Sequence, residues 1–441
     1  MSVIRDLAAF VTTASAAKLP ADECAMLRRH VADTLLAAVA GAKTTEGRAL
    51  RKVVPHASVA EAAGMMAAVI RHTEIDDIHT RSCTTPSSVT VPVALALARQ
   101  HGAYEPDTVA SAVWIGTELM ARLGVAIDGA RILYRGLWPT YFTAPLGTAA
   151  IAARMLHLNE EQTAHALSLA LMLSAGRSGR FHGALPGRSV ILAMAVTNGI
   201  RAAETAAQGV GGDPALLDGP WLRDAQGIDA KIEALTAGLG SGSIYREMTI
   251  KPFCSAKQAI AAIEAFTAIV DGGVSPDAIT KVIVHVPPPY SRMVAMKADA
   301  GARASTIVSA AFQMGLVAYH RERLYDIERA DAMKETAALG LAGKVEIVAD
   351  ESLLEFFPAT FPAEVEVVAN GKTLRQRITA ANGDPGRALD DAALARKAAK
   401  VLAFIPGSSP QEIVTTGLDG LDNSSACKAL ADALWYNCVE R

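Results

Sequence analysis

The sequence predicts a mainly helical protein in which a large all-helical domain is interrupted by a smaller α+β domain. Alanine is abundant and favours helix, and apolar segments with helical spacing fill the chain up to residue 248. From residue 249 the pattern changes to short segments of alternating apolar and polar residues, which is typical of strands. We therefore expect helices in 1–248, an α+β lid domain in 249–388, and C-terminal helices in 389–441 that return to the helical domain.

The first 248 residues contain several helix-like segments. Pro20 suits a first helical turn, and the apolar stripe after it recurs every four residues, at Leu27, Val31, Leu35 and Val39. Further segments with broad apolar faces, typical of buried helices, occupy 91–100, 106–123, 145–156, 160–173 and 190–208. Between them lie two irregular connectors that gather cationic residues and glycine, 130–141 and 174–188. They are either candidate binding loops or solvated surface loops.

The α+β domain is predicted from three alternating segments. These are KVIVHVP (281–287), KVEIV (344–348) and EVEVV (364–368). Asn370-Gly371 separates the last of them from TLRQRI, and this dipeptide between two alternating segments is a strong hairpin signal. Helical spacing returns in 390–404 and 424–436, which defines the expected C-terminal segment.

Composition excludes several classes of partner. The chain has 441 residues and a net charge of −3 with mixed signs, so no basic patch indicates a nucleic-acid partner. The sequence has neither a long uninterrupted apolar span nor a polybasic amphipathic segment, so nothing in it indicates a membrane partner. The N-terminus does not resemble a signal peptide. The five cysteines are scattered without CxxC spacing, which favours reduced thiols. We expect a cytoplasmic protein.

The densest group of ionisable residues lies in RHTEIDDIHTRSCTTPSSVTVP (71–92), between apolar segments. It contains His72, Glu74, Asp76, Asp77 and His79 within eight positions. In a helix, the first, third and last of these would share one face. Three interpretations remain open: a self-paired polar helix end, a divalent metal site, and a catalytic acid–base cluster. The spacing lacks the HExxH pattern of zinc sites, which counts against the metal.

Four motifs of the chain resemble those of the MmgE/PrpD family, which includes 2-methylcitrate dehydratase, cis-aconitate decarboxylase and iminodisuccinate epimerase. EIDDIH followed by TPSS (85–88) resembles the family's DFDDTH followed by HPS. The other three are AVTNGIRAAETAAQGVGGDPALLDG (195–219), KPFCSAKQAIAAIEA (251–265) and ANGDPGRALDDAALARKAAKVL (381–402). The resemblance spans nearly the whole chain. It implies a large all-helical domain with a smaller α+β lid, a homodimer, and chemistry without a metal or an organic cofactor.

The resemblance also implies a set of site positions, which we expect to converge on one cleft between the helical domain and the lid: Glu74, His79, Thr85, Trp138, Tyr141, Arg180, Arg188 and Lys251. Lys251 and His79 match family active-site residues. Glu74 stands where the family has an aspartate. Three further substitutions replace proton carriers. Thr85 and Trp138 stand where the family has histidines, and Arg188 stands where it has a lysine.

These residue types suit proton abstraction beside a carboxylate. The aci-carboxylate that forms needs cations aimed at its oxygens, and guanidinium groups bind carboxylates in bidentate geometry. Arg135, Arg177, Arg180, Arg188 and Lys251 are the candidate cations. An epimerase needs one proton carrier on each face of the carbon. We expect Lys251, with its pKa lowered by neighbouring arginines, on one face, and Tyr141 or His79 on the other.

We therefore predict an epimerase of a small di- or tricarboxylate such as iminodisuccinate. One alternative is a lyase, either a dehydratase or a decarboxylase, acting on a methylcitrate- or aconitate-like acid. The other is a catalytically silent relative that only binds the substrate. The missing histidines count against the lyase, because a departing hydroxyl needs an acid. The retained Lys251 counts against the silent relative.

Overall fold

The computed structural model describes residues 2–53, 58–176, 187–299, 303–329 and 331–440. Helices account for 63% of it, which confirms the predicted mainly α class. The chain divides into two compact units. The second unit is Thr249–Gly407, and the other described residues form the first unit, to which the chain returns at Ser408.

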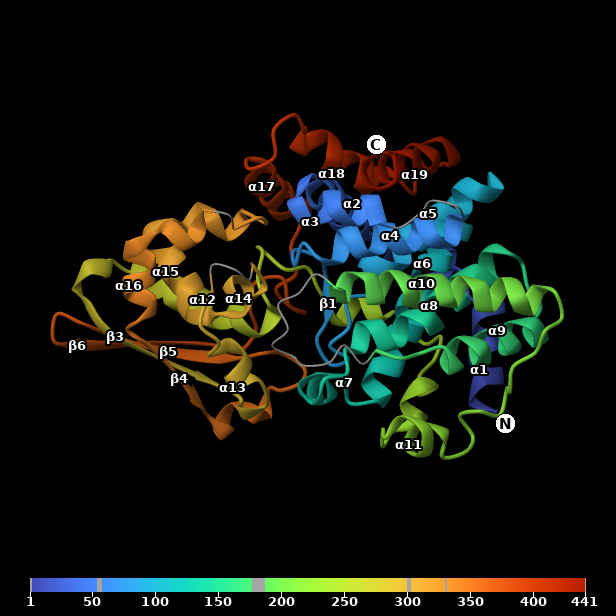
Figure 1. Cartoon of the computed structure of the whole chain (residues 1–441), viewed down its shortest axis with the longest axis horizontal. Helices are drawn as coiled ribbons and strands as arrows, with labels where there is room; N and C mark the ends of the chain where they lie inside the picture. Colours follow the sequence, from blue (N-terminus) through green and yellow to red (C-terminus); the bar gives the residue numbers. More distant parts are fainter. Residues whose placement is uncertain (1, 54–57, 177–186, 300–302, 330, 441) are drawn as a thin grey trace. The chain divides into compact units, whose positions relative to one another are not determined.

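The centre of the first unit is a layer of long helices. It contains α4 (Val59–Arg71), α6 (Pro106–Ala126), α8 (Pro139–Met155) and α10 (Gly187–Ala207). α10 packs against both α4 and α8, and α6 packs against α8 (Figure 1). α4, α6 and α8 are almost entirely buried, as their broad apolar faces predict.

Among the described residues, α6 is the one helix that is long and apolar enough to span a membrane. Of its apolar window, 83% is buried inside the protein. The core helices of soluble proteins have the same property, and burial among its neighbours accounts for the apolar character of α6.

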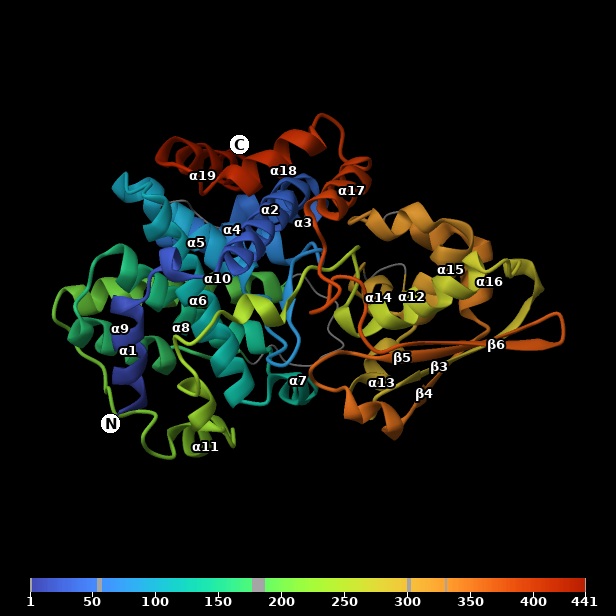
Figure 2. The ribbon, with the colours of Figure 1, turned by 180° about the vertical axis from the view of Figure 1, so that it is seen from behind.

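The remaining elements of the first unit surround this layer. They are α1 (Val3–Thr13), α2 (Ala21–Lys43), α3 (Thr45–Val53), β1 (Ile78–His79), α5 (Ser87–His101), α7 (Gly129–Ile132), α9 (Glu160–Met172), α11 (Trp221–Gln226), α18 (Pro410–Asp419) and α19 (Ser424–Cys438). The stripe from Leu27 to Val39 on α2 is buried, as predicted. α18 packs on α2, and α19 packs on α2 and α5 (Figures 1 and 2).

Two helices begin earlier than the sequence predicted. α5 follows Pro86, and α8 begins at Pro139, so Pro92 and Pro145 lie inside helices rather than at their starts. The N–H groups of the first helical turn have no acceptor within the helix, so a proline at that point loses no hydrogen bond. This is why Pro139 can begin α8. The expected connector 130–141 is therefore partly helical, and it ends in the first turn of α8.

The second unit is built on a four-stranded sheet of order β4–β3–β5–β6. The strands are β3 (Ile279–Val286), β4 (Val345–Ala349), β5 (Ala363–Ala369) and β6 (Lys372–Ile378). β4 runs parallel to β3, and the other neighbours are antiparallel. Asn370 (φ 51°) and Gly371 (φ 71°) form the turn between β5 and β6, which confirms the hairpin.

The α-helices of the second unit are α12 (Lys257–Asp271), α13 (Pro288–Val294), α14 (Arg303–Val308), α15 (Ala310–Tyr319), α16 (Thr336–Ala342) and α17 (Asp391–Leu402). Of these, α12 and α13 contact the sheet, and the others pack on helical elements of the unit. α12 lies against β5 and β6, and α15 packs on α12 (Figure 1). α17 belongs to this unit, because it packs on the short 3-10 helix Arg321–Tyr325. The expected third segment, 389–441, thus divides at Gly407.

Candidate active site

The polar segment after α4 is not a helix. α4 ends at Arg71, and turns and the two-residue strand β1 follow before α5 begins. Glu74 has a left-handed backbone (φ 61°), which a helix cannot accommodate. The single face that His72, Asp76 and His79 would share in a helix therefore does not form. The described residues contain no group of three or more His, Cys, Asp or Glu side chains arranged to hold a metal ion.

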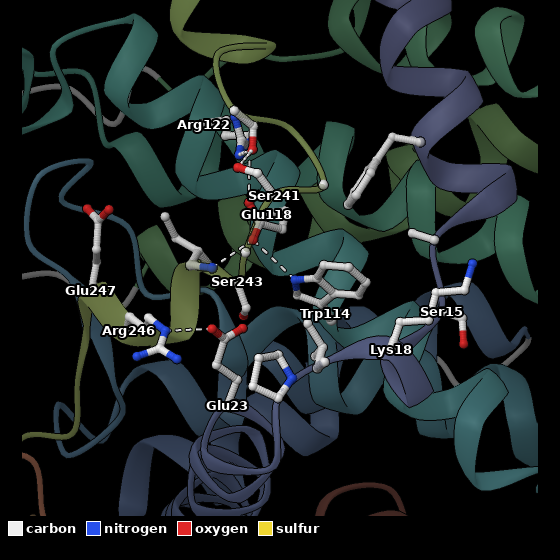
Figure 3. A pocket seen from close by; sticks show the side chains of 18 of the residues that line it. Ser15, Lys18, Glu23, Trp114, Glu118, Arg122, Ser241, Ser243, Arg246 and Glu247 are labelled. Atoms are coloured by element: carbon white, nitrogen blue, oxygen red, sulfur yellow. Dashed lines mark hydrogen bonds and ion pairs between the residues drawn. The ribbon is translucent and has the colours of Figure 1, made fainter.

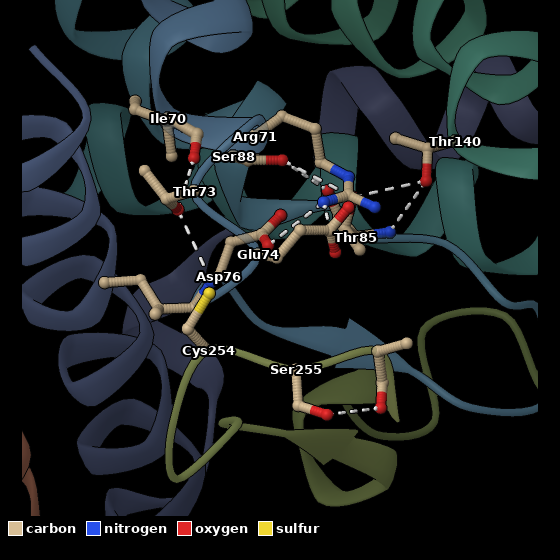
Figure 4. A network of polar contacts seen from close by, with 12 residues as sticks. Ile70, Arg71, Thr73, Glu74, Asp76, Thr85, Ser88, Thr140, Cys254 and Ser255 are labelled. Atoms are coloured by element: carbon tan, nitrogen blue, oxygen red, sulfur yellow. Dashed lines mark hydrogen bonds and ion pairs between the residues drawn. The ribbon is translucent and has the colours of Figure 1, made fainter. Parts of the chain in front are cut away.

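The Glu74 carboxylate lies between two guanidinium groups. Arg71 Nη1 is 2.9 Å from Oε2, and Arg188 Nη2 is 3.0 Å from Oε1. Arg71 also lies 3.3 Å from Asp76 Oδ1, and Figure 4 shows it beside both carboxylates. Glu74 is a buried residue from the turn, whereas Arg188 comes from the start of α10. Chain segments 114 residues apart thus meet at this carboxylate.

Arg71 is a buried cation with capacity left for another acceptor. Burial would lower its pKa, but the carboxylates of Asp76 and Glu74 outweigh burial, and the pKa is raised. The side chain therefore stays charged. Its Nε has no hydrogen-bond partner in the described part of the chain. A buried donor of this kind is normally satisfied by protein, water or ligand.

Trp138 and Tyr141 form the aromatic side of the cluster. Trp138 is the N-cap of α8, and its ring stacks on that of Tyr141 at 5.5 Å between centroids with 14° between the planes. The Arg188 guanidinium lies 4.8 Å from the centroid of the Trp138 ring, a cation–π contact. Arg188 is thus held by Glu74 at its edge and by the indole on its face.

The Tyr141 phenol is protonated at neutral pH. Its side chain is 2% exposed, and this burial raises its pKa. The positive charges of Arg188 and Arg71 act in the opposite direction but do not cancel the effect of burial. In the resting protein Tyr141 is therefore a proton donor.

Thr85 belongs to a group of hydroxyls beside the start of α5. Its N–H donates to Thr140 Oγ1 at 3.0 Å, and the two hydroxyl oxygens are 3.2 Å apart. The Ser88 hydroxyl donates to the Thr85 carbonyl at 2.8 Å (Figure 4). Because Thr140 directly precedes Tyr141, these bonds tie Thr85 to the first turn of α8. A hydroxyl held in this way can orient a ligand but is a poor acid.

Both ring nitrogens of His79 have partners within the first unit. Nδ1 is 2.8 Å from Ser82 Oγ, and Nε2 is 3.3 Å from Glu247 Oε2, which also accepts from Arg81 at 2.9 Å. The hydrogen bond from His79 lowers the pKa of Glu247 to about 2, with Arg81 adding to the effect and burial opposing it. Since His79 is fully buried and bonded at both nitrogens, it is better placed to hold structure than to exchange protons.

Lys251 lies in the second unit, just after β2 (Met248–Thr249), and is buried. Its local backbone is fixed by the loop that carries Asp384. Asp384 Oδ1 accepts from the Thr249 hydroxyl at 2.9 Å and lies 2.6 Å from Lys257 Nζ. A Cβ at Gly383 (φ 94°) would lie 2.0 Å from the Ile250 carbonyl oxygen, so only glycine fits there.

The structure thus joins four of the predicted site residues by direct contact: Glu74, Trp138, Tyr141 and Arg188. Thr85 and His79 have separate networks, Lys251 is in the second unit, and Arg180 and Arg177 lie outside the described residues. Sequence reasoning missed Arg71, Thr140 and Glu247. Arg71 could have been found, because it is a cation at the end of an alanine-rich apolar segment and directly precedes a group of carboxylates. No comparable local signal pointed to Thr140 or Glu247.

Comparison with known families agrees with the two units. The profile of the MmgE/PrpD N-terminal domain matches residues 5–230, and that of the MmgE/PrpD C-terminal domain matches residues 253–419. No curated protein matches the chain. The interval between the two family matches contains the passage from the first unit to the second, at Met248.

Proposed function

The chain belongs to the MmgE/PrpD family, and from this premise we propose that it is a cofactor-independent epimerase of a small di- or tricarboxylate such as iminodisuccinate. Family membership makes it an enzyme of small acids, of the dehydratase and lyase kind or related to it. The observation that carries the proposal is the buried, protonated Tyr141 beside two guanidinium groups.

Arg188 and Arg71 are the proposed carboxylate ligands. Removing a proton from the carbon beside a carboxylate places negative charge on its oxygens, and preorganised cations in a buried site stabilise that charge. Arg188 is oriented by Glu74 and Trp138, and Arg71 has an Nε without a partner in the described structure. In this proposal Glu74 positions both cations, and it does not itself transfer a proton.

Lys251 and Tyr141 are the proposed proton carriers. In this proposal Lys251 is the base that takes the proton from one face of the carbon, and the Tyr141 phenol gives a proton to the other face. The inverted product then leaves an ammonium and a phenolate, which exchange protons with solvent before the next turnover. His79, the other candidate, is bonded to Ser82 and Glu247 and is assigned a positioning role.

A lyase is the second candidate, and the same phenol favours it. The positions of two family histidines hold Thr85 and Trp138, which cannot protonate a departing hydroxyl. Tyr141 carries a proton that it can donate, since the ordinary pKa of a phenol, 10, is already above neutral and burial raises it further. The third candidate is a silent relative that only binds the substrate. The cations of the cluster disfavour it, because such cations stabilise the charge that develops on a reacting carboxylate in addition to binding the substrate.

Proton NMR in D2O distinguishes the three candidates. The purified protein is incubated with iminodisuccinate, methylcitrate and aconitate in separate samples. Loss of the signal of the proton beside a carboxylate, with no new product except the epimer, is the expected result. Alkene signals, or consumption of an alkene, would instead identify a lyase. If every substrate signal stays unchanged, the chain is a binding protein and the proposal is wrong.

A further inference from the structure

A pocket lies entirely within the first unit. Its volume is about 890 Å³, and its walls are the N-terminal segment from Phe10 to Glu23, α6, and the segment from Ala237 to Glu247 (Figure 3). On one side Phe10 and Trp114 pack edge to face, with ring centroids 5.5 Å apart. Carboxylates line another part of the wall, at Glu23, Glu118 and Glu247. This combination of an apolar and an acidic wall is typical of a small-molecule site.

Glu118 has a structural role in the wall. Its Oε1 accepts from Trp114 Nε1 at 3.1 Å and from the Ile244 N–H at 2.7 Å. Its Oε2 accepts from Arg122 Nε at 2.9 Å, and Arg122 also donates to the Ala237 carbonyl at 2.8 Å. Both partners of this ion pair are therefore satisfied by protein groups and offer little to a ligand.

Glu23 differs, because half of its carboxylate lacks a donor. The side chain is 2% exposed, and its Oε1 accepts from Arg246 Nε at 2.5 Å. Its buried Oε2 has no hydrogen-bond partner in the part of the chain that the structure describes. The Arg246 side chain that covers it is 54% exposed and has a second partner, since its Nη2 lies 2.8 Å from Asp22. A buried anionic oxygen without a donor is unfavourable.

We propose that this pocket binds an organic ammonium ion with an apolar body. The ammonium group donates to Glu23 after Arg246 moves to Asp22 alone, and the apolar body lies against Phe10 and Trp114. A carboxylate ligand would be repelled by the acidic walls of the pocket. Among the cations that line it, the exposed Lys18 is the one without a carboxylate partner in the described structure, so little positive charge is left to bind an anion. The proposal goes beyond the proposed function and does not depend on it.

Isothermal titration calorimetry with 2-phenylethylamine at neutral pH tests the site. We expect one amine bound per chain, and no binding of 3-phenylpropanoate, which has a similar body and the opposite charge. Glu23→Gln should weaken binding of the amine about tenfold or more, because it removes a charge-assisted hydrogen bond. Glu233→Gln makes the same change at an exposed position outside the pocket and should leave binding unchanged.

Arg246→Ala gives a second, independent readout. It removes the cation that competes for Glu23, so the amine should bind more tightly than to the wild type. This variant decides the question even if Glu23→Gln does not fold. The proposal is overturned if the amine does not bind, if the carboxylate binds equally well, if Glu23→Gln binds like the wild type, or if Arg246→Ala does not strengthen binding.

Discussion

At the scale of single residues, burial and neighbouring charges act in opposite directions on the pKa of Tyr141, the proposed proton donor. The phenol lies under an indole and beside two guanidinium groups, yet burial dominates and keeps the proton on the oxygen. In the proposed reaction this phenol is the proton donor of a site in which Thr85 and Trp138 stand where the family has histidines. Its ring is held by stacking on Trp138, and its hydroxyl is the group proposed to transfer a proton, so the two contributions can be separated by mutation.

Tyr141→Phe removes the hydroxyl and keeps the ring that stacks on Trp138. We expect turnover to fall by about 10²–10⁴-fold, the usual contribution of a positioned acid or base. The melting temperature should stay close to that of the wild type. Tyr245→Phe is the matched control, since Tyr245 is also a buried phenol but its hydroxyl lies 3.4 Å from Thr117, away from the cluster. Equal turnover in both variants would rule out Tyr141 as a proton carrier.

Glu247 makes a prediction about pH and stability. Its pKa in the folded protein is about 2, below its ordinary value of 4.5, so folding favours the ionised form. Its stabilising contribution is therefore complete above about pH 5 and is lost as the pH falls toward 2. In thermal unfolding over this range, Glu247→Gln should lose less stability on acidification than the wild type. The exposed Glu160→Gln should follow the wild-type curve; parallel curves for all three would contradict the pairing with His79.

At the scale of elements, α10, which carries Arg188 near its start, approaches α8 closely. A Cβ at Gly199 would lie 1.8 Å from Thr148 Oγ1 and 2.3 Å from the Pro145 carbonyl oxygen. Glycine at this point lets the two helices pack against each other, and Arg188 near the start of α10 then reaches Glu74.

Gly199→Ala should lower the free energy of unfolding by about 1–3 kcal/mol, because the added methyl group has no space. The better helix propensity of alanine, worth at most about 1 kcal/mol, does not compensate for this. Urea unfolding measures the difference. Gly340→Ala in α16 is the control, since a Cβ there would meet no atom within 4 Å, and it should be neutral or slightly stabilising. A Gly199→Ala protein as stable as the wild type would show that the helices can separate at no cost.

At the scale of the whole molecule, the proposed reaction draws on both units, with Arg188 from the first and Lys251 from the second. Arg188→Met and Lys251→Met should each reduce turnover about a hundredfold or more, with little change in melting temperature. The double variant should lose less than the product of the two single losses, because residues of one site act together. Lys281→Met, at an exposed lysine of the second unit, should keep full activity. Strictly multiplicative losses would contradict a shared site.

Much of the architecture follows from the sequence alone. The family motifs extend over the chain, and the change from helical spacing to alternation near residue 249 coincides with the passage between the units. Asn370-Gly371 specified its hairpin because both residues tolerate a positive φ. These features are local, since period, composition and turn residues act over a few positions, and they can be recognised without knowing the path of the chain.

The site required the tertiary structure. A helix would have placed His72, Asp76 and His79 on one face, but the left-handed Glu74 belongs to a turn, and there the two histidines have different partners. Arg188 reaches Glu74 across 114 residues, and Glu247 reaches His79 across 168. Whether a buried carboxylate is paired, and whether a phenol keeps its proton, depends on charges brought close by the fold. Electrostatic energies depend on distance in space, and the order of residues in the chain does not determine that distance.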